Sequence, residues 1–192
     1  SILKNHTLAG STTEGALLSA PGRVAHTGKG LTVIGDVEGT ISKPTAAIQV
    51  AFDTAGFRTK TSLNIRGMLW TKAIVNAAIN PLSSLTRLPN GELVKNALIR
   101  GVGNRVIEEG ISVALAMRVR LTDDPKKLWR TILSATRANK SSMLQDIEKG
   151  KRTEIRQLNG AIVRSGKRVR VATPVNDVLM RLVLGLEKSQ GL

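Results

Sequence analysis

The sequence predicts an α+β chain in which a strand-rich segment, residues 1–62, precedes an all-helical domain, residues 63–192. Before position 36 the chain is rich in Thr, Val, Leu and Gly with interspersed turn signals, which is typical of strands. From position 66 onward apolar residues recur at helical spacing. A few strands at one end of a chain make a poor sheet, so we expect residues 1–62 to be the end of a larger α/β unit.

The strand-rich segment contains its own turn and helix signals. HTLAGSTTEGALL and RVAHTGKGLTVIG predict strands, SAPG at 19–22 predicts the turn between them, and GKG at 28–30 predicts a hairpin loop. A helix follows in ISKPTAAIQVAFDTAG, where Pro44 suits the first turn and Gly56 suits the stop. FRTKTS, residues 57–62, predicts a short strand.

The rest of the chain predicts helices throughout. Their expected spans are about 66–80, 92–119, 125–138, 141–149, 154–165 and 174–188. Asp124 before Pro125 and Thr173 before Pro174 each predict a capped helix start. Pro81 disfavours helical geometry at the residue before it, so the first of these helices should end or bend there. The last helix carries one apolar stripe, formed by Val175, Leu179, Leu182, Val183 and Leu186.

The charge balance favours anionic partners. The chain has 29 Lys and Arg against 14 Asp and Glu, a net charge of +15. Nucleic acid, phosphates and carboxylate metabolites all fit such a balance. Aromatic residues make up 2% of the chain and Tyr is absent, so a base-stacking platform is nearly impossible to build. We therefore do not expect nucleic acid to be the partner.

Other classes of function are disfavoured by what the sequence lacks. Without cysteine there can be no disulfide or thiolate metal site, which fits a reducing compartment, and we expect a cytoplasmic protein. His6 and His26 are expected to be surface histidines and not metal ligands. No apolar run approaches the ~18 residues of a membrane span. GVG at 101–103 lies inside a helical stretch, and no G-x-G-x-x-G opens a βαβ unit, so these residues carry no dinucleotide fingerprint.

A polar stripe is the first candidate for chemistry. In MLWTKAIVNAAINPL, Lys72, Asn76 and Asn80 lie at i, i+4 and i+8, which places them on one helical face among apolar residues. Such a stripe is expected to line a cleft between packed helices. The alternative is a snorkelling lysine beside two surface amides.

The second candidate is the stretch SSMLQDIEKGKRTEIRQLNG, residues 141–160. Ser142 lies near the start of a short helix, where a hydroxyl and backbone N–H groups can hold a carboxylate. Glu154 is either a first-turn charge on the next helix or a carboxylate across a cleft from a buried lysine proton donor. Asn90 in PNGEL is, taken alone, more often just a turn residue.

These residues also carry a family resemblance. LWTKAIVNAAINPLSSL, PNGEL, RANKSSMLQDIEKGKRTEIRQLNGAIV and TPVNDVL resemble the helical domain of ketopantoate reductase, in order and spacing. GSTTEGALLSAPGRVAHTGKGLTVIG looks like the last strands of that family's nucleotide-binding domain. The resemblance covers essentially the whole chain and implies a helical domain similar to the C-terminal domain of 6-phosphogluconate dehydrogenase.

The resemblance implies an activity and assigns roles. The reaction would be NADPH-dependent reduction of 2-dehydropantoate to (R)-pantoate, in pantothenate and coenzyme A biosynthesis, by a homodimer. Lys72 matches the proton donor, Glu154 matches a carboxylate at the cofactor end of the cleft, and Ala16 falls where the backbone touches NADPH. The expected substrate-binding residues are Asn76, Asn80, Asn90, Asn139 and Ser142. This favours Glu154 as part of a site.

One departure from the family leaves alternatives open. The family's chain begins with a Rossmann segment that carries the glycine fingerprint and the 2′-phosphate site, and neither occurs in these residues. We expect that segment to be missing or separate, and this chain alone to be inactive. A non-catalytic relic or binding module of the same fold is the competing hypothesis, with nucleic-acid binding as an outsider. Coding sequence immediately upstream would discriminate between them.

Overall fold

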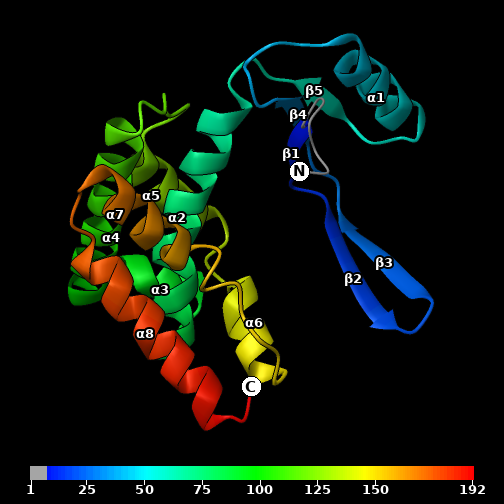
Figure 1. Ribbon diagram of the computed structural model, residues 1–192. Helices are drawn as coiled ribbons and strands as arrows, with labels where there is room; N and C mark the ends of the chain where they lie inside the picture. Colours follow the sequence, from blue (N-terminus) through cyan, green and yellow to red (C-terminus); the bar gives the residue numbers. More distant parts are fainter. Residues whose placement is uncertain (1–7) are drawn as a thin grey trace. The chain divides into compact units, whose positions relative to one another are not determined.

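The computed structural model describes residues 8–192, which form the α+β fold expected from the sequence (Figure 1). Two compact units divide at Leu69, inside a helix. The functional domains expected at 1–62 and 63–192 stay a prediction. His6 and the start of the first expected strand lie outside the described residues.

Unit 1 contains a three-stranded sheet in the order β1-β4-β5. β1 (Leu8–Thr12) pairs antiparallel with β4 (Thr32–Asp36), and β4 pairs parallel with β5 (Thr59–Thr61). Helix α1 (Lys43–Thr54) makes the crossover that a parallel pair requires. Strands β2 (Gly15–Ala20) and β3 (Arg23–Gly28) form a separate antiparallel ribbon, visible in blue in Figure 1.

A buried carboxylate joins β4 to α1. Asp36, at the end of β4, accepts hydrogen bonds from the Ser42 N–H at 2.6 Å, the Ser42 hydroxyl at 3.0 Å and the Thr45 hydroxyl at 2.7 Å. The Ser42 N–H, followed by the Thr45 hydroxyl, lowers the pKa of Asp36. Ser42 is the N-cap of α1 and Pro44 lies in its first turn, as expected from the sequence. These hydrogen bonds fix the position of the first turn of α1 relative to the end of β4.

The hairpin loop expected at GKG was wrong. β3 pairs with β2 and β4 pairs with β1, so the residues between β3 and β4 link two different sheets. Thr13 and Leu31 exchange hydrogen bonds beyond the end of β1, with the Leu31 N–H donating to the Thr13 hydroxyl at 2.8 Å. A Cβ on Gly30 would lie 2.3 Å from the Thr13 carbonyl carbon. This close approach of two backbones explains the glycine and diverts the chain from a hairpin.

Unit 2 is helical. Its helices are α2 (Ile65–Thr86, which begins in unit 1), α3 (Asn90–Lys95), α4 (Ala97–Ala116), α5 (Pro125–Ala135), α6 (Ser142–Glu148), α7 (Asn159–Val169) and α8 (Pro174–Ser189). Two glycines of α4 allow close packing: a Cβ on Gly103 would meet the ring of Trp129, and one on Gly110 would meet Ile74. The main core therefore forms where α4 meets α2 and α5.

Several expected helix boundaries were wrong. α2 continues through Pro81 to Thr86, so the expected end at about residue 80 was wrong, and the alternative of a bend at Pro81 stays a prediction. The stretch 92–119 is two helices, separated at Asn96, whose side chain caps α4 by accepting from the Leu98 and Ile99 N–H groups. α7 begins at Asn159 and not at 154. Of the expected apolar stripe in α8, Leu182 is 52% exposed and lies off the buried face.

The two proline-flanked starts behave differently. Asp124 caps α5 as expected, accepting from the Lys126 N–H at 2.9 Å. Thr173 precedes α8 without a side-chain cap bond. The Glu109 carboxylate of α4 takes that role, accepting from the Val175 N–H at 2.8 Å and the Asn176 N–H at 3.0 Å. A tertiary contact thus replaces the local cap. Among the helices of residues 8–192, none combines the length and the hydropathy of a membrane span.

Candidate active site

The polar stripe on α2 runs from the surface into the core. Lys72 is exposed, Asn76 is half-buried, and Asn80 is buried at 6% exposure. Ile74 and Ala77, on the flanks of the stripe, are fully buried. The expectation of a buried lysine was therefore wrong for this structure. Asn76 and Asn80 are progressively more buried and lie beside apolar side chains of the core. A cation at the surface end and amides further in can bind the two ends of a small polar anion.

A second group of predicted residues meets between α3 and the link after α5. The Asn90 N–H donates to the Asn139 carbonyl at 2.9 Å, and the Gly91 N–H donates to the Arg137 carbonyl at 2.9 Å. The Asn90 side chain is buried, and its Nδ2 donates to the Thr136 hydroxyl at 2.8 Å. Its Oδ1 is buried without a partner among the described residues. Asn90 is thus more than a turn residue, because it offers a buried, unused acceptor.

Ser142 and Glu154 are tied to α2 by a small second core. Met143, which follows Ser142, packs with Ile155, which follows Glu154, and with Val183. Leu85 of α2 packs against the same cluster. Ser142 itself is exposed, and the N-cap of α6 is the preceding Ser141, whose hydroxyl accepts from the Leu144 N–H at 3.1 Å. The packing brings the backbone at Ser142 and at Glu154 to one small core, with α2 against it.

Glu154 occupies an anchored turn and does not belong to a helix. It lies five positions before α7, so it is not a first-turn charge on that helix. Its neighbour Thr153 donates through both its N–H and its hydroxyl to the Glu187 carboxylate of α8, at 2.7 and 2.6 Å. Ile155 on the other side is fully buried. The exposed Glu154 carboxylate is therefore presented from a backbone that is held on both sides.

Sequence reasoning missed the residues that hold this turn. Glu187 is buried at 8% exposure although it carries a charge, and Thr153 binds it. A usable signal existed, because Glu187 follows the buried Val183 by four residues and so shares its helical face. Asn159 and Asn176, two fully buried amides, were missed in the same way. Amides that recur among apolar residues indicate a polar network.

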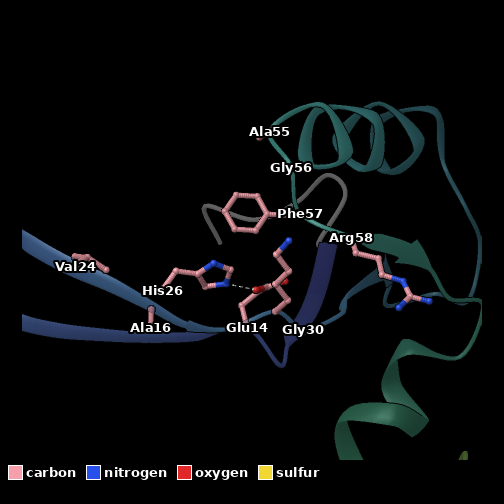
Figure 2. A pocket seen from close by; sticks show the side chains of 10 residues that line it. Glu14, Ala16, Val24, His26, Gly30, Ala55, Gly56, Phe57 and Arg58 are labelled. Atoms are coloured by element: carbon pink, nitrogen blue, oxygen red, sulfur yellow. Dashed lines mark hydrogen bonds and ion pairs between the residues drawn. The ribbon is translucent and has the colours of Figure 1, made fainter.

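Ala16 lies in unit 1, where it lines a hollow of about 740 Å³ (Figure 2). The ribbon contributes Ala16, Val24 and His26, and the segment after α1 contributes Phe57 and Arg58. Figure 2 shows the His26 ring directed at Glu14, at 2.6 Å between Nε2 and Oε2. The hydrogen bond from His26, followed by the one from the Gly30 N–H, lowers the pKa of Glu14.

The hollow carries cations as well as this hydrogen bond. Lys29 and Arg58 both line it, against the single carboxylate of Glu14. Its walls thus favour an anionic group. In the described residues, no group of three or more His, Cys, Asp or Glu side chains could hold a metal ion.

The fold and the stripe define a class of protein: an all-helical domain with a lysine and amides on one helix, preceded by a few strands of an α/β unit. The chain belongs to the ketopantoate reductase family of oxidoreductases. The family model described as "Ketopantoate reductase PanE/ApbA C terminal" matches residues 64–187. The resemblance noted in the sequence is thereby confirmed.

Known relatives support the assignment. A 2-dehydropantoate 2-reductase of Archaeoglobus fulgidus is 39% identical over 94% of this chain. The crystal structure of a ketopantoate reductase from Ralstonia eutropha superposes with a TM-score of 0.88 at 38% identity, covering 96% of this chain and 60% of that one. A D-mandelate dehydrogenase with NADH and anilino(oxo)acetate gives a TM-score of 0.84 at 29% identity, over 96% of this chain and 61% of its own. The chain spans 60% of the length of the archaeal relative.

Proposed function

We propose that this chain forms the substrate-binding and proton-donating side of an NADPH-dependent 2-dehydropantoate 2-reductase, which makes (R)-pantoate for pantothenate and coenzyme A. The observation that carries the proposal is the small core of Met143, Ile155 and Val183, to which Leu85 of α2 adds. It places the backbone beside Ser142 and Glu154 against the last turn of α2, the helix that bears Lys72 nearer its start. The family membership and the names of the relatives supply the reaction.

Lys72 is assigned the proton transfer. A bound nicotinamide cofactor would supply the hydride for the keto carbon, which would leave negative charge on the keto oxygen. The Lys72 ammonium donates a proton to this oxygen. As a cation it also offsets the negative charge that develops on the oxygen, and both effects are strongest in the transition state.

The amides and Ser142 are assigned to the substrate's carboxylate and hydroxyl. Asn76, Asn80 and Ser142 can donate to a carboxylate, since each carries an N–H or O–H group. Asn90 is different: its Nδ2 already donates to Thr136, whereas its Oδ1 is free of protein partners in the described chain. The resemblance assigns Asn90 to the same group of substrate contacts, and its Oδ1 is the atom that lacks a protein partner within residues 8–192. Asn139, whose backbone binds Asn90, is assigned to the same region.

Each unit contributes one proposed contact to the cofactor. In unit 1 the backbone at Ala16 borders a hollow with Lys29 and Arg58 on its wall, which fits the anionic groups of a dinucleotide. In unit 2 the Glu154 carboxylate is held in an anchored turn, which fits a hydrogen-bond acceptor for a ribose hydroxyl. The preference for NADPH over NADH rests on the resemblance alone, since a D-mandelate dehydrogenase of similar fold was solved with NADH.

We predict that this chain alone does not reduce 2-dehydropantoate. A glycine fingerprint that would bind the pyrophosphate occurs nowhere in its 192 residues. Most of the rate of hydride transfer comes from holding the nicotinamide ~3–3.5 Å from the keto carbon. Calorimetric titration of NADPH into the chain, with turnover followed by nicotinamide absorbance, should show weak or no binding and no turnover. Micromolar binding with steady turnover would contradict this.

The function itself is tested in the enzyme that contains this chain, which we also propose to be a cytoplasmic homodimer. Steady-state rates are compared for 2-dehydropantoate and for an aromatic 2-keto acid, each with NADPH and with NADH. The expected result is a higher kcat/KM for 2-dehydropantoate with NADPH. A preference for the aromatic keto acid with NADH would favour a mandelate dehydrogenase, and no turnover in any combination would favour the non-catalytic hypothesis.

A further inference from the structure

We propose that Asn159 is a positioning residue that replaces the hydrogen bond missing from α2 at Pro81 and so holds the turn that carries Asn76 and Asn80. The role of this turn in substrate binding rests on the proposed function. The replacement of the bond does not, because it follows from contacts within unit 2.

The need for the bond comes from Pro81. In an α-helix the N–H of residue i donates to the carbonyl of residue i−4, and proline has no N–H. The Ala77 carbonyl of α2 therefore loses its regular donor, although the helix continues for five residues beyond Pro81 to Thr86. Ala77 is fully buried, so water is a poor substitute. A continuous helix at this point needs a donor from another element.

Asn159, the first residue of α7, supplies that donor. Its Nδ2 lies 3.0 Å from the Ala77 carbonyl oxygen and 3.0 Å from Oδ1 of Asn176. A carboxamide nitrogen has two hydrogens, so both are used by these two acceptors. Asn159 is fully buried, and its own Oδ1 has no partner among the described residues. The side chain is thus committed to donation, at the cost of an unsatisfied acceptor.

A second amide fixes this orientation. The Nδ2 of Asn176 donates to the Val106 carbonyl at 3.2 Å and to the Glu109 carboxylate at 2.7 Å. Because both partners are acceptors, the Oδ1 of Asn176 must turn the other way, toward Asn159. Rotating the Asn159 carboxamide by half a turn would place its oxygen against two acceptors. A chain of hydrogen bonds therefore runs from Glu109 on α4 through α8 and α7 to α2.

The last acceptor in this series of hydrogen bonds, the Ala77 carbonyl, lies within the polar stripe of α2. Ala77 directly follows Asn76, and its carbonyl would normally close the turn that contains Asn80. A proline inside a helix removes one hydrogen bond and its ring crowds the carbonyl four residues earlier, and both effects favour a kink. Such a kink would move Asn76 relative to Asn80, and the substrate would lose one of two groups that have to act together. By binding the Ala77 carbonyl, Asn159 limits this movement without contacting the substrate.

A double-mutant cycle tests the replacement of the bond in this chain. Pro81→Ala restores an N–H that can donate to Ala77, so Asn159→Leu should cost less in that background. We expect Asn159→Leu to lower Tm by roughly 5–10 °C with Pro81 in place, and roughly half as much together with Pro81→Ala. Asn96→Ala, which removes a cap of α4 far from these bonds in the chain, is the control and should lower Tm equally in both backgrounds. Equal losses for Asn159→Leu in both backgrounds would overturn the proposal.

Kinetics of the enzyme containing this chain test the positioning. Asn159→Leu should raise KM for 2-dehydropantoate about tenfold with kcat within about threefold, because it disturbs substrate binding and not the proton donor. Pro81→Ala should restore part of the KM, and Asn96→Ala should leave both constants unchanged. An unchanged KM in an active Asn159→Leu enzyme would overturn the positioning role. If the enzyme does not reduce 2-dehydropantoate at all, the proposed function fails and the Tm cycle still decides whether the bond is replaced.

Discussion

Unit 1 and unit 2 are each stabilised internally by a different kind of contact. Unit 2 buries a contiguous apolar core in which Trp129, Leu133, Ile107 and Val106 are fully inaccessible. In unit 1, the buried hydrophobic residues of the described chain are Ile34 and Ile65. Large apolar side chains are instead exposed there, including Leu18 at 67% and Val24 at 68%. Burial of apolar surface, the main stabilising force of a domain, is thus concentrated in unit 2.

Unit 1 relies more on polar contacts. Its buried polar residues are Thr32, Asp36, Thr45 and Thr59, and the Asp36 carboxylate connects the sheet to α1. Hydrogen bonds to a charge are strong but depend on protonation, whereas apolar packing does not. The comparison implies that the two units should respond differently to truncation and to acid.

Trp129→Ala should have the largest effect on stability. The side chain is fully buried against Gly103 of α4, and truncating a buried aromatic residue costs about 3–5 kcal/mol. Phe57→Ala in unit 1 is the matched variant and should cost less than about 1.5 kcal/mol, since Phe57 is 43% exposed. Urea unfolding followed by circular dichroism measures both. Equal losses would show that the cores do not differ as described.

Asp36 should make the stability of unit 1 depend on pH. Its folded-state pKa is lowered, so its contribution is fully present above the unfolded-state value of ~3.9 and is lost as the pH falls below it. We expect Asp36→Asn to speed amide exchange in β4 and α1 several-fold at neutral pH. In the variant, the stability of β4 and α1 should also fall less between pH 7 and pH 3 than it does in the unchanged chain. Hydrogen exchange measured between pH 7 and pH 3, with α4 as the internal reference, would contradict this if β4 and α4 respond alike.

Leu18→Ser should have almost no effect on stability. Leu18 lies in β2 and is 67% exposed, so its removal leaves no cavity in the described structure. A change within about 0.5 kcal/mol is expected, as for surface substitutions in general. Thermal unfolding of the chain measures it. A loss above about 2 kcal/mol would mean that the ribbon has a packing partner in this chain.

The helical domain could be predicted from the sequence because its signals are local. Helical periodicity and the Asp124–Pro125 start lie within a few residues of the features they predict. The prediction that α2 ends at Pro81 was wrong for a physical reason. The local effect of a proline is to end a helix, but Asn159, a residue 78 positions later, supplies the missing donor. A tertiary contact of that kind cannot be predicted from the residues around Pro81.

The candidate site was predictable in the same partial way. The helical spacing of Lys72, Asn76 and Asn80 indicated the stripe, but the exposure of Lys72 depends on what packs over α2. The hydrogen bond between Asn90 and Asn139 joins residues 49 positions apart, and the pairing of Thr153 with Glu187 is similarly remote. Spacing predicts which residues share a face, and the fold decides which faces meet. The roles assigned to these residues stay predictions.

The proton-donating role proposed for Lys72 is tested by the kinetic effect of Lys72→Ala in the enzyme that contains this chain. A positioned general acid contributes ~10²–10⁴-fold, so kcat should fall by that factor while KM for 2-dehydropantoate changes little. Lys127→Ala, which removes an exposed lysine from α5, is the control and should leave kcat unchanged. Ser142→Ala should show the opposite split, with a raised KM and a nearly unchanged kcat. A Lys72→Ala enzyme that retains kcat within about threefold would contradict the assignment of Lys72 as the proton donor.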